Sequence, residues 1–317
     1  MMKSKFYIGI DIGGTNIKSA LVKDDKIIKR KKVLTYADQG PSAVVDQIIK
    51  AIQIFEKPLS HIGIGIAGII DSRKGIVRYS PNLAGWSDVK LARLIKREFK
   101  VPVKILNDVN SICLGEWKFG AGRGYNNIFL FTLGTGVGGA AVCEGKLLFG
   151  ANGFAGEFGH SVIKYDGKKC TCGQFGHLEG YVGARYIVER TKRRMRKQKS
   201  TLRKYKKITP YIIAQEAKRG DVLAKEIFAE IGFYIGIGLS NIISLFDPEV
   251  IIVSGGISRA GKILFDSIRK TADERIMGSV YRDFKIIPGK LGDDAGILGA
   301  VYFASSFSTR STRSKNR

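Results

Sequence analysis

Two segments of this sequence repeat one pattern, and the repeat limits the folds that the chain can adopt. Residues 8–15 read IGIDIGGT, and residues 129–136 read FLFTLGTG. In each segment an apolar strand runs into glycines and a threonine, and a second strand follows. Two similar α/β halves would place the two glycine turns on opposite sides of a cleft, where they could hold the phosphates of a nucleotide. The repeat therefore predicts a two-lobed α/β protein that binds a nucleotide.

The rest of the apolar periodicity fits this organisation. In the first half we expect strands at 5–10, 17–22, 26–33, 61–67 and 103–106, and helices at 41–55, 89–99 and 108–117. In the second half we expect strands at 127–133, 140–148 and 249–254, a glycine turn at 134–139, and helices at 183–198, 210–218 and 222–246. A helix, a strand and a helix then close the chain.

These elements predict a division into domains. An N-terminal α/β lobe is expected at 1–117 and a C-terminal α/β lobe at 118–295. The last helix, at 296–308, is expected to pack back on the first lobe, and 309–317 forms a basic tail. A chain of 317 residues with 44% hydrophobic residues can bury the cores that two lobes need.

The charge is strongly basic, with 53 Lys and Arg against 28 Asp and Glu and a formal net charge of +25. Such a chain attracts anions, including nucleotides and sugar phosphates. The basic residues cluster at 26–32, 192–207 and 310–317. These clusters are either solvated faces and a frayed end or sites for a polyanion, and no nucleic-acid-binding motif accompanies them.

The sequence also indicates the compartment. Four cysteines, of which Cys113 and Cys143 are isolated, do not form a disulfide framework. No signal peptide is expected, because Asp11 and glycines interrupt the first apolar run. The apolar stretch 231–246 is shorter than the roughly 20 residues that span a bilayer, so a buried helix is expected. We therefore expect a cytoplasmic protein that does not contact a membrane.

The two glycine turns are candidate phosphate sites. Glycine lets the backbone approach phosphate oxygens and offers N–H donors, and threonine adds a hydroxyl. Either turn alone could be an ordinary hairpin turn, but Asp11 beside the first can hold magnesium, directly or through water. Gly255 and Gly256, after a later strand, either pass close to the adenosine or form a simple turn. The residues expected at the nucleotide are Asp11, Gly13, Gly14, Thr15, Asn16, Lys18, Gly134, Thr135, Gly136, Gly255 and Gly256.

Two other nucleotide motifs are disfavoured. Residues 134–139 match the dinucleotide pattern G-x-G-x-x-G, but that pattern needs a helix to follow, and AAVCEGKLLFG resembles a second hairpin strand. The pattern of the P-loop, G-x-x-x-x-G-K-[ST], is absent from the sequence.

Eight segments in order resemble the ROK family of repressors, open reading frames and kinases. They are IGIDIGGTNIKSALV, GIGIAGIID, PNLAGW, ILNDVN, LGTGVGG, GANGFAGEFGH, CTCGQFGHLEGY and GDDAGILGA, and they extend from Ile8 to Ala300. The resemblance implies a two-lobed actin-like, hexokinase-like ATPase fold with duplicated ribonuclease H-like domains. It also implies an ATP-dependent kinase that phosphorylates a hydroxyl of a hexose, with glucose as the first candidate.

The resemblance also assigns the sugar site. Asp108 follows a strand, where an aspartate could cap the next helix; the family uses this aspartate as the general base. Asn107 is expected to contact sugar hydroxyls. Glu157, His160 and Glu179 complete the site by resemblance, because carboxylates can accept hydrogen bonds from adjacent hydroxyls. Gly68 and Asn82 are further candidates, although Asn82 could simply begin a turn after Pro81.

A metal site is indicated by His160, Cys170, Cys172 and His177. Two thiolates and two imidazoles suit tetrahedral zinc. The family pattern has cysteine where this chain has His177, so the zinc could be weak or absent. Four protein ligands leave no open position, which favours a structural zinc that fixes the loop carrying Glu179 over a catalytic one.

Several alternatives stay open at this point. N-acetylmannosamine, N-acetylglucosamine, mannose and fructose remain possible substrates, since Ala67 and Ile69 depart from the proline-containing family pattern near the sugar. A sugar-responsive repressor would need an N-terminal helix-turn-helix domain, for which the first strand leaves no room. A non-catalytic sensor is a third possibility. From the resemblance to the family we expect a homo-oligomer, most simply a dimer.

Overall fold

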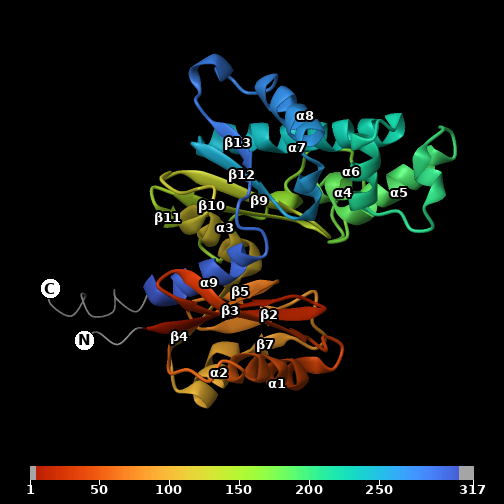
Figure 1. Cartoon of the computed structure of the whole chain (residues 1–317). Helices are drawn as coiled ribbons and strands as arrows, with labels where there is room; N and C mark the ends of the chain where they lie inside the picture. Colours follow the sequence, from red (N-terminus) through yellow and green to blue (C-terminus); the bar gives the residue numbers. More distant parts are fainter. Residues whose placement is uncertain (1–4, 307–317) are drawn as a thin grey trace. The chain divides into compact units, whose positions relative to one another are not determined.

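Two five-stranded sheets organise the protein, whose computed structural model describes residues 5–306 (Figure 1). Each sheet belongs to its own compact unit. Within the described residues, unit 1 comprises 5–124, Phe149–Ala155 and 290–306, and unit 2 comprises Tyr125–Leu148 and Gly156–Gly289. The domain boundaries expected at residues 117 and 295 stay a prediction.

The sheet of unit 1 has the strand order β3-β2-β1-β4-β8. Its strands are β1 (Phe6–Ile12), β2 (Asn16–Lys23), β3 (Lys26–Leu34), β4 (Leu59–Ile66) and β8 (Val103–Asn107). β1, β2 and β3 form an antiparallel meander, whereas β1, β4 and β8 are parallel. The carboxyl ends of β1, β4 and β8 therefore lie along one edge of the sheet, with Asp11 opposite Gly65 and Ile66 opposite Asn107.

Helices cover both faces of this sheet. α1 (Gly40–Gln53) and α2 (Leu91–Phe99) share one hydrophobic core with the sheet, and α3 (Asp108–Phe119) and α9 (Asp294–Ser306) pack on the other side. α9 approaches the strands closely, because a Cβ placed on Gly63 would lie 2.1 Å from the carbonyl oxygen of Ala300. Only glycine allows this contact between helix and sheet.

A small antiparallel sheet between β4 and α2 was not expected from the sequence. It consists of β5 (Ile69–Asp71), β6 (Ile76–Tyr79) and β7 (Ser87–Val89). Val89 pairs with Val77, so the helix expected from residue 89 begins at Leu91 instead. Strands of three or four residues carry too little periodicity for sequence reasoning to find them.

Unit 2 repeats the architecture of unit 1. Its sheet has the order β11-β10-β9-β12-β13, in which β9, β10 and β11 are antiparallel and β9, β12 and β13 are parallel. The strands are β9 (Ile128–Leu133), β10 (Val137–Cys143), β11 (Lys146–Leu147), β12 (Val250–Ser254) and β13 (Lys285–Pro288). This duplicated mixed α/β architecture confirms the two similar halves that the repeat in the sequence predicted, and it agrees with the actin-like, hexokinase-like fold that the resemblance implied.

Two expectations for this sheet were wrong in detail. The glycine turn expected at 134–139 is shorter, because Gly138 and Gly139 pair with Thr132 and Phe131 inside the sheet. The single strand expected at 140–148 is a hairpin, since Glu144 and Gly145 both adopt positive φ angles between β10 and β11.

The helical elements of unit 2 pack on one another and on its sheet. They are η1 (Phe158–His160), α4 (Glu179–Val182), α5 (Ala184–Met195), η2 (Thr201–Lys204), α6 (Pro210–Lys218), α7 (Val222–Phe246), η3 (Gly256–Ala260), α8 (Lys262–Asp273) and η4 (Ser279–Tyr281). Among residues 5–306, α7 alone is long and apolar enough to cross a membrane by length and composition. However, 56% of its most apolar window is buried, as in the core helix of a globular unit.

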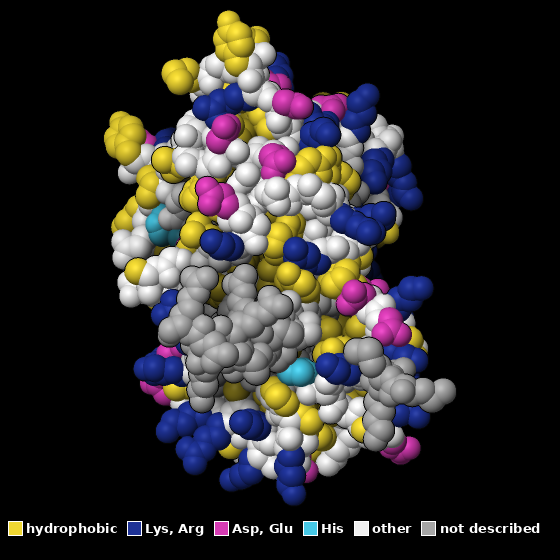
Figure 2. Space-filling view, turned by 90° about the vertical axis from the view of Figure 1, so that its left-hand side faces the viewer, with side chains coloured by type: hydrophobic (Ala, Val, Ile, Leu, Met, Phe, Trp, Pro, Cys, Tyr) yellow, Lys and Arg dark blue, Asp and Glu magenta, His cyan; other side chains and the backbone are white. Residues whose placement is uncertain are grey.

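Lys and Arg side chains outnumber Asp and Glu side chains on the surface drawn in Figure 2. Lys and Arg gather at the lower end of that view, which unit 1 occupies, with fewer acidic side chains among them. The basic tail expected at 309–317 lies outside the described residues.

Candidate active site

The first glycine turn connects β1 to β2 in unit 1. The N–H of Gly13 donates to the carbonyl of Asn16 (3.0 Å), and the buried Thr35 hydroxyl donates to the carbonyl of Gly13 (2.7 Å). Gly14 and Thr15 at the tip are exposed. Thr35, which sequence reasoning missed, thus fixes the base of a turn whose tip remains accessible to a ligand.

Asp11 lies near the end of β1, directly before this turn, and its pKa is raised. Burial is the main cause that raises its pKa, to about 6, and the negative charge of Asp108 adds to the effect. Lys18 opposes the shift, and it is ion-paired with Asp293 (3.0 Å). A cation between the two carboxylates would relieve this repulsion.

The pair Asn107-Asp108 stands where β8 becomes α3. Asn107 is the N-cap of the helix: its Oδ1 accepts from the N–H groups of Val109 (2.9 Å) and Asn110 (3.2 Å). The cap role considered for Asp108 therefore belongs to Asn107, and Asp108 is the first residue of α3. Asp108 therefore lies at the helix N-terminus, where the positive end of the helix dipole favours a negative charge.

Two further candidates lie beside these groups in unit 1. The carbonyl of Gly68 accepts from Nδ2 of Asn107 (3.2 Å), so Gly68 adjoins the end of β8. Asn82 is exposed and adjoins the glycine turn, since a Cβ on Gly14 would lie 3.5 Å from the Cβ of Asn82. Unit 1 thus brings the turn, both aspartates, Asn107, Gly68 and Asn82 to one region of the sheet edge.

The second glycine turn, in unit 2, is built into the same region as Glu179. Oε2 of Glu179 accepts from the N–H of Val137 (3.0 Å), directly after the turn. A Cβ on Gly136 would lie 2.6 Å from that oxygen, so a larger residue there would displace the Glu179 carboxylate. The N–H of Gly134 donates to the carbonyl of Gly136 (3.0 Å), which leaves Thr135 at the tip.

The remaining nucleotide candidates adjoin this turn. Gly255 follows β12 with a positive φ of 91°, and a Cβ there would lie 2.3 Å from the carbonyl oxygen of Leu133. Gly255 and Gly256 therefore lie beside the residue that precedes Gly134.

Glu157, a candidate for the sugar site, is exposed and immediately precedes η1.

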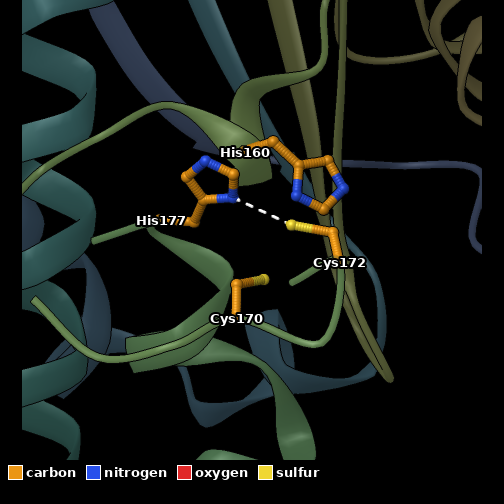
Figure 3. Close-up of side chains that lie close together, drawn as sticks. All are labelled: His160, Cys170, Cys172 and His177. Atoms are coloured by element: carbon orange, nitrogen blue, oxygen red, sulfur yellow. Dashed lines mark hydrogen bonds between the residues drawn. The ribbon is translucent and has the colours of Figure 1, made fainter. Parts of the chain in front are cut away.

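His160, Cys170, Cys172 and His177 converge in unit 2, where one donor atom from each lies within 4.8 Å of the others (Figure 3). Sγ of Cys172 is 3.2 Å from Nδ1 of His177. Nδ1 of His160 is buried without a hydrogen-bond partner among the described residues. A buried polar atom of this kind is costly unless something binds it, so the geometry fits a metal ion at the centre of the four groups.

Burial shifts the pKa of two of these four groups. It is the main cause that lowers the pKa of His177 and raises the pKa of the Cys170 thiol. Neutral imidazole is the form that binds metal, whereas the thiols must lose their protons when a metal enters.

The cluster is connected to Glu179 through Thr171. The Thr171 hydroxyl donates to Oε1 of Glu179 (3.0 Å), and the Cys170 thiol is 3.7 Å from the same oxygen. Thr171 was not singled out from the sequence, although it stands between the two cysteines. The loop that would hold the metal therefore also positions Glu179.

Comparisons with known proteins agree with this arrangement. The model of the ROK family matches residues 7–306. The chain belongs to the ROK family.

Among curated ROK proteins, a glucokinase of Thermotoga maritima is 37% identical over 303 residues, which cover 93% of this chain and 95% of that protein. A xylose repressor of Bacillus subtilis is 31% identical, covering 94% of this chain and 76% of the repressor. The solved structure of a ROK glucokinase from Streptomyces griseus, in complex with glucose and AMPPNP, has a TM-score of 0.80 and 32% identity, and covers 95% of this chain and 99% of that one.

Proposed function

We propose that this protein is an ATP-dependent glucose kinase that forms glucose 6-phosphate. The observation that carries the proposal is the similarity to glucokinases over nearly the whole chain. Asp108, the first residue of α3 directly after β8, agrees with it. The repressor similarity is a weaker guide, because about a quarter of that protein has no counterpart in this chain.

Asp108 acts as the general base. Its carboxylate accepts the proton of the attacking sugar hydroxyl while the oxygen attacks the terminal phosphorus of ATP, so that ADP leaves. Asn107 binds the sugar beside Asp108. Its Oδ1 is already occupied by two backbone N–H groups, so the second N–H of Nδ2 is the group it offers to a sugar hydroxyl.

Glu157, His160 and Glu179 of unit 2 and Gly68 and Asn82 of unit 1 bind other parts of the hexose. Glu179 is the best supported of these, since backbone and hydroxyl donors hold both of its oxygens. Such fixed carboxylates can discriminate sugars by the hydroxyls they accept from. N-acetylmannosamine, N-acetylglucosamine, mannose and fructose remain the competing substrates.

The glycine turns bind the phosphates of ATP. The exposed tips at Gly14, Thr15 and Thr135 offer backbone N–H and hydroxyl donors, and Lys18 supplies a positive charge. Asn16 begins β2 next to the first tip, and Gly255 and Gly256 give the adenosine a close approach to the backbone. Magnesium, held at Asp11 directly or through water, would neutralise phosphate charge.

The four-residue cluster holds a structural zinc ion. Two thiolates and two imidazoles would supply its four ligands, so the ion would serve the structure of the loop rather than bind a substrate. His160, Cys170, Cys172 and His177 thereby hold the loop that carries Thr171, which in turn fixes Glu179.

We also propose that the enzyme acts in the cytoplasm, where ATP and free hexoses meet, and that it forms a homo-oligomer, most simply a dimer. A non-catalytic sugar sensor is the alternative of another class. The similarity to a xylose repressor is the observation that favours this sensor.

A coupled ADP-release assay with magnesium-ATP and a panel of hexoses and N-acetylhexosamines tests the proposal. We expect turnover that depends on sugar, with glucose giving the highest kcat/KM. A higher kcat/KM with another sugar would support the kinase reaction but would change the assigned substrate. Folded, zinc-loaded protein with no sugar-dependent ADP release would support the sensor.

A further inference from the structure

The outer surface of α2 carries a row of cations that the proposed reaction does not use. The row consists of Lys90, Arg93, Lys96, Arg97 and Lys100. Arg93, Lys96 and Arg97 lie within α2 at spacings of one to four residues, and Lys90 and Lys100 flank the helix as its N-cap and C-cap residues. Leu91 and Ile95, on the opposite face, are fully buried in the core of unit 1.

This cation row borders a surface hollow of about 750 Å³, whose one other lining residue is Leu94. All five cations are exposed, and within residues 5–306 none of them takes part in an ion pair. Glu98, the one acidic residue of α2, does not line the hollow. The lower end of Figure 2 shows the excess of positive charge on unit 1. A hollow with five uncompensated positive charges is suited to a polyanion.

The other basic segments within the described residues are organised differently. Along β3, successive side chains point to opposite faces of the strand, and Arg30 is paired with Asp294. In 192–207, Arg194 is paired with Glu226 and Lys204 with Glu216. The cation row therefore differs from both segments, because its side chains gather at one hollow and form no ion pair within the described residues.

The lining of the hollow indicates the chemistry of the polyanion. It contains no aromatic side chain on which a base could stack and no amide or hydroxyl side chain that could recognise a base edge or a 2′-hydroxyl. Insertion of α2 into a bilayer is excluded as well, because its apolar face is already buried. The ligand that matches is a chain of phosphates without bases.

We propose that the cation row of α2 is a docking surface for inorganic polyphosphate. The chain of phosphates lies along the helix and exchanges its bound counterions for the five side chains. Binding requires neither sugar nor ATP, so it is independent of the proposed kinase reaction.

The test measures binding of fluorescently labelled long-chain polyphosphate to the full-length protein by anisotropy, over a range of salt concentrations. One variant replaces Lys90, Arg93, Arg97 and Lys100 with Gln. The matched control replaces Lys26, Lys29, Lys31 and Lys32 of β3 with Gln, which changes the net charge equally. Circular dichroism verifies that both variants are folded.

We expect the α2 variant to bind roughly 10- to 100-fold more weakly, with the slope of log K against log salt reduced by about three. The β3 control should retain most of the affinity. Equal losses in the two variants, or no loss in the α2 variant, would overturn the assignment. Tighter binding of a single-stranded RNA of matched charge would overturn polyphosphate as the ligand. Any of these results would leave the kinase proposal untouched, because no turnover is measured.

Discussion

At the scale of single residues, the account depends most on Asp108. Replacing Asp108 with Asn keeps the size of the side chain and removes the base. We expect kcat to fall roughly 10²- to 10⁴-fold, with zinc content and melting temperature unchanged. Steady-state kinetics with glucose and ATP, together with metal analysis, measure this. Full turnover by folded Asp108→Asn would remove Asp108 from the mechanism.

Asp11 offers a second prediction, in which stability and activity change in opposite directions. Its pKa is raised from 3.8 to about 6, so the folded protein holds the proton more tightly than the unfolded chain does. Ionised Asp11 therefore costs stability increasingly as pH rises from about 4 to 6, and the whole cost, up to about 3 kcal/mol, is present above that range.

In magnesium-free buffer at pH 7, Asp11→Asn should therefore melt at a higher temperature than the wild type, while its turnover with magnesium-ATP is lower. At pH 3.5 the two proteins should melt at similar temperatures. A variant that is less stable at pH 7 would show that Asp11 is satisfied within the fold.

Sequence reasoning placed these residues but could not assign all their contacts. The order Asn-Asp after an apolar strand suggested a base or a cap at Asp108, and the structure gives the cap to Asn107. Which of two neighbouring polar residues caps a helix depends on backbone angles at the junction, and the sequence carries little information about those. The contacts of Thr35 with Gly13 and of Asp293 with Lys18 join different segments of the chain, which the local sequence pattern does not reveal.

At the scale of elements, the proposed zinc site implies that the metal loop, residues 160–177, depends for its order on His160, Cys170, Cys172 and His177. We expect Cys172→Ser to lose zinc and thermal stability, and to raise the KM for sugar because Glu179 is no longer held. Metal analysis and melting curves measure this. His177→Cys serves as the matched control, since it restores the ligand usual in the family and should keep one zinc per chain. Zinc-free wild type that is fully stable and active would contradict the structural role.

Glu216 connects η2 to α6 and makes a pH-dependent contribution. Its carboxylate accepts from Thr201, Tyr205 and Arg219, and the Thr201 hydroxyl is the main cause that lowers its pKa from 4.5 to about 2. A lowered pKa stabilises the fold above about pH 4.5, and this contribution disappears as pH falls towards 2.

We therefore expect Glu216→Gln to melt at a lower temperature than the wild type at neutral pH, and the difference to shrink between pH 4.5 and 2. Glu189→Gln, which removes a surface partner of Arg185, is the control and should change little. A difference in melting temperature between wild type and Glu216→Gln that stays constant across this pH range would show that Glu216 does not make stability depend on pH.

The longer elements were predictable because their apolar periods are long. The helices at 210–218 and 222–246 agree with α6 and α7 at both ends, since Thr209 and Asp221 supply caps. The strands β5, β6 and β7 escaped prediction because they are short and half exposed. Gly138 and Gly139 were misplaced in a turn because glycine is uncommon inside strands, and the close approach of Gly156 and Phe158 to Gly139 cannot be seen in the sequence.

At the scale of the whole molecule, the repeat in the sequence corresponds to a repeat in topology. Both sheets combine an antiparallel meander with two parallel strands in the same order. That correspondence, together with membership of the ROK family, makes a nucleotide-dependent sugar kinase the simplest account of the glycine turns, the aspartates and the carboxylate beside the metal loop. Which sugar is preferred depends on a few hydrogen bonds, and the sequence leaves these open.

The central claim is transfer of a phosphoryl group from ATP to a hydroxyl of glucose, and phosphorus NMR of the reaction mixture tests it most directly. The protein is incubated with magnesium-ATP and glucose, beside Asp108→Asn and a reaction without sugar. The account predicts stoichiometric glucose 6-phosphate and ADP with wild type, and neither above background in the two controls. Inorganic phosphate in place of a sugar phosphate, or glucose 6-phosphate formed equally well by Asp108→Asn, would contradict it.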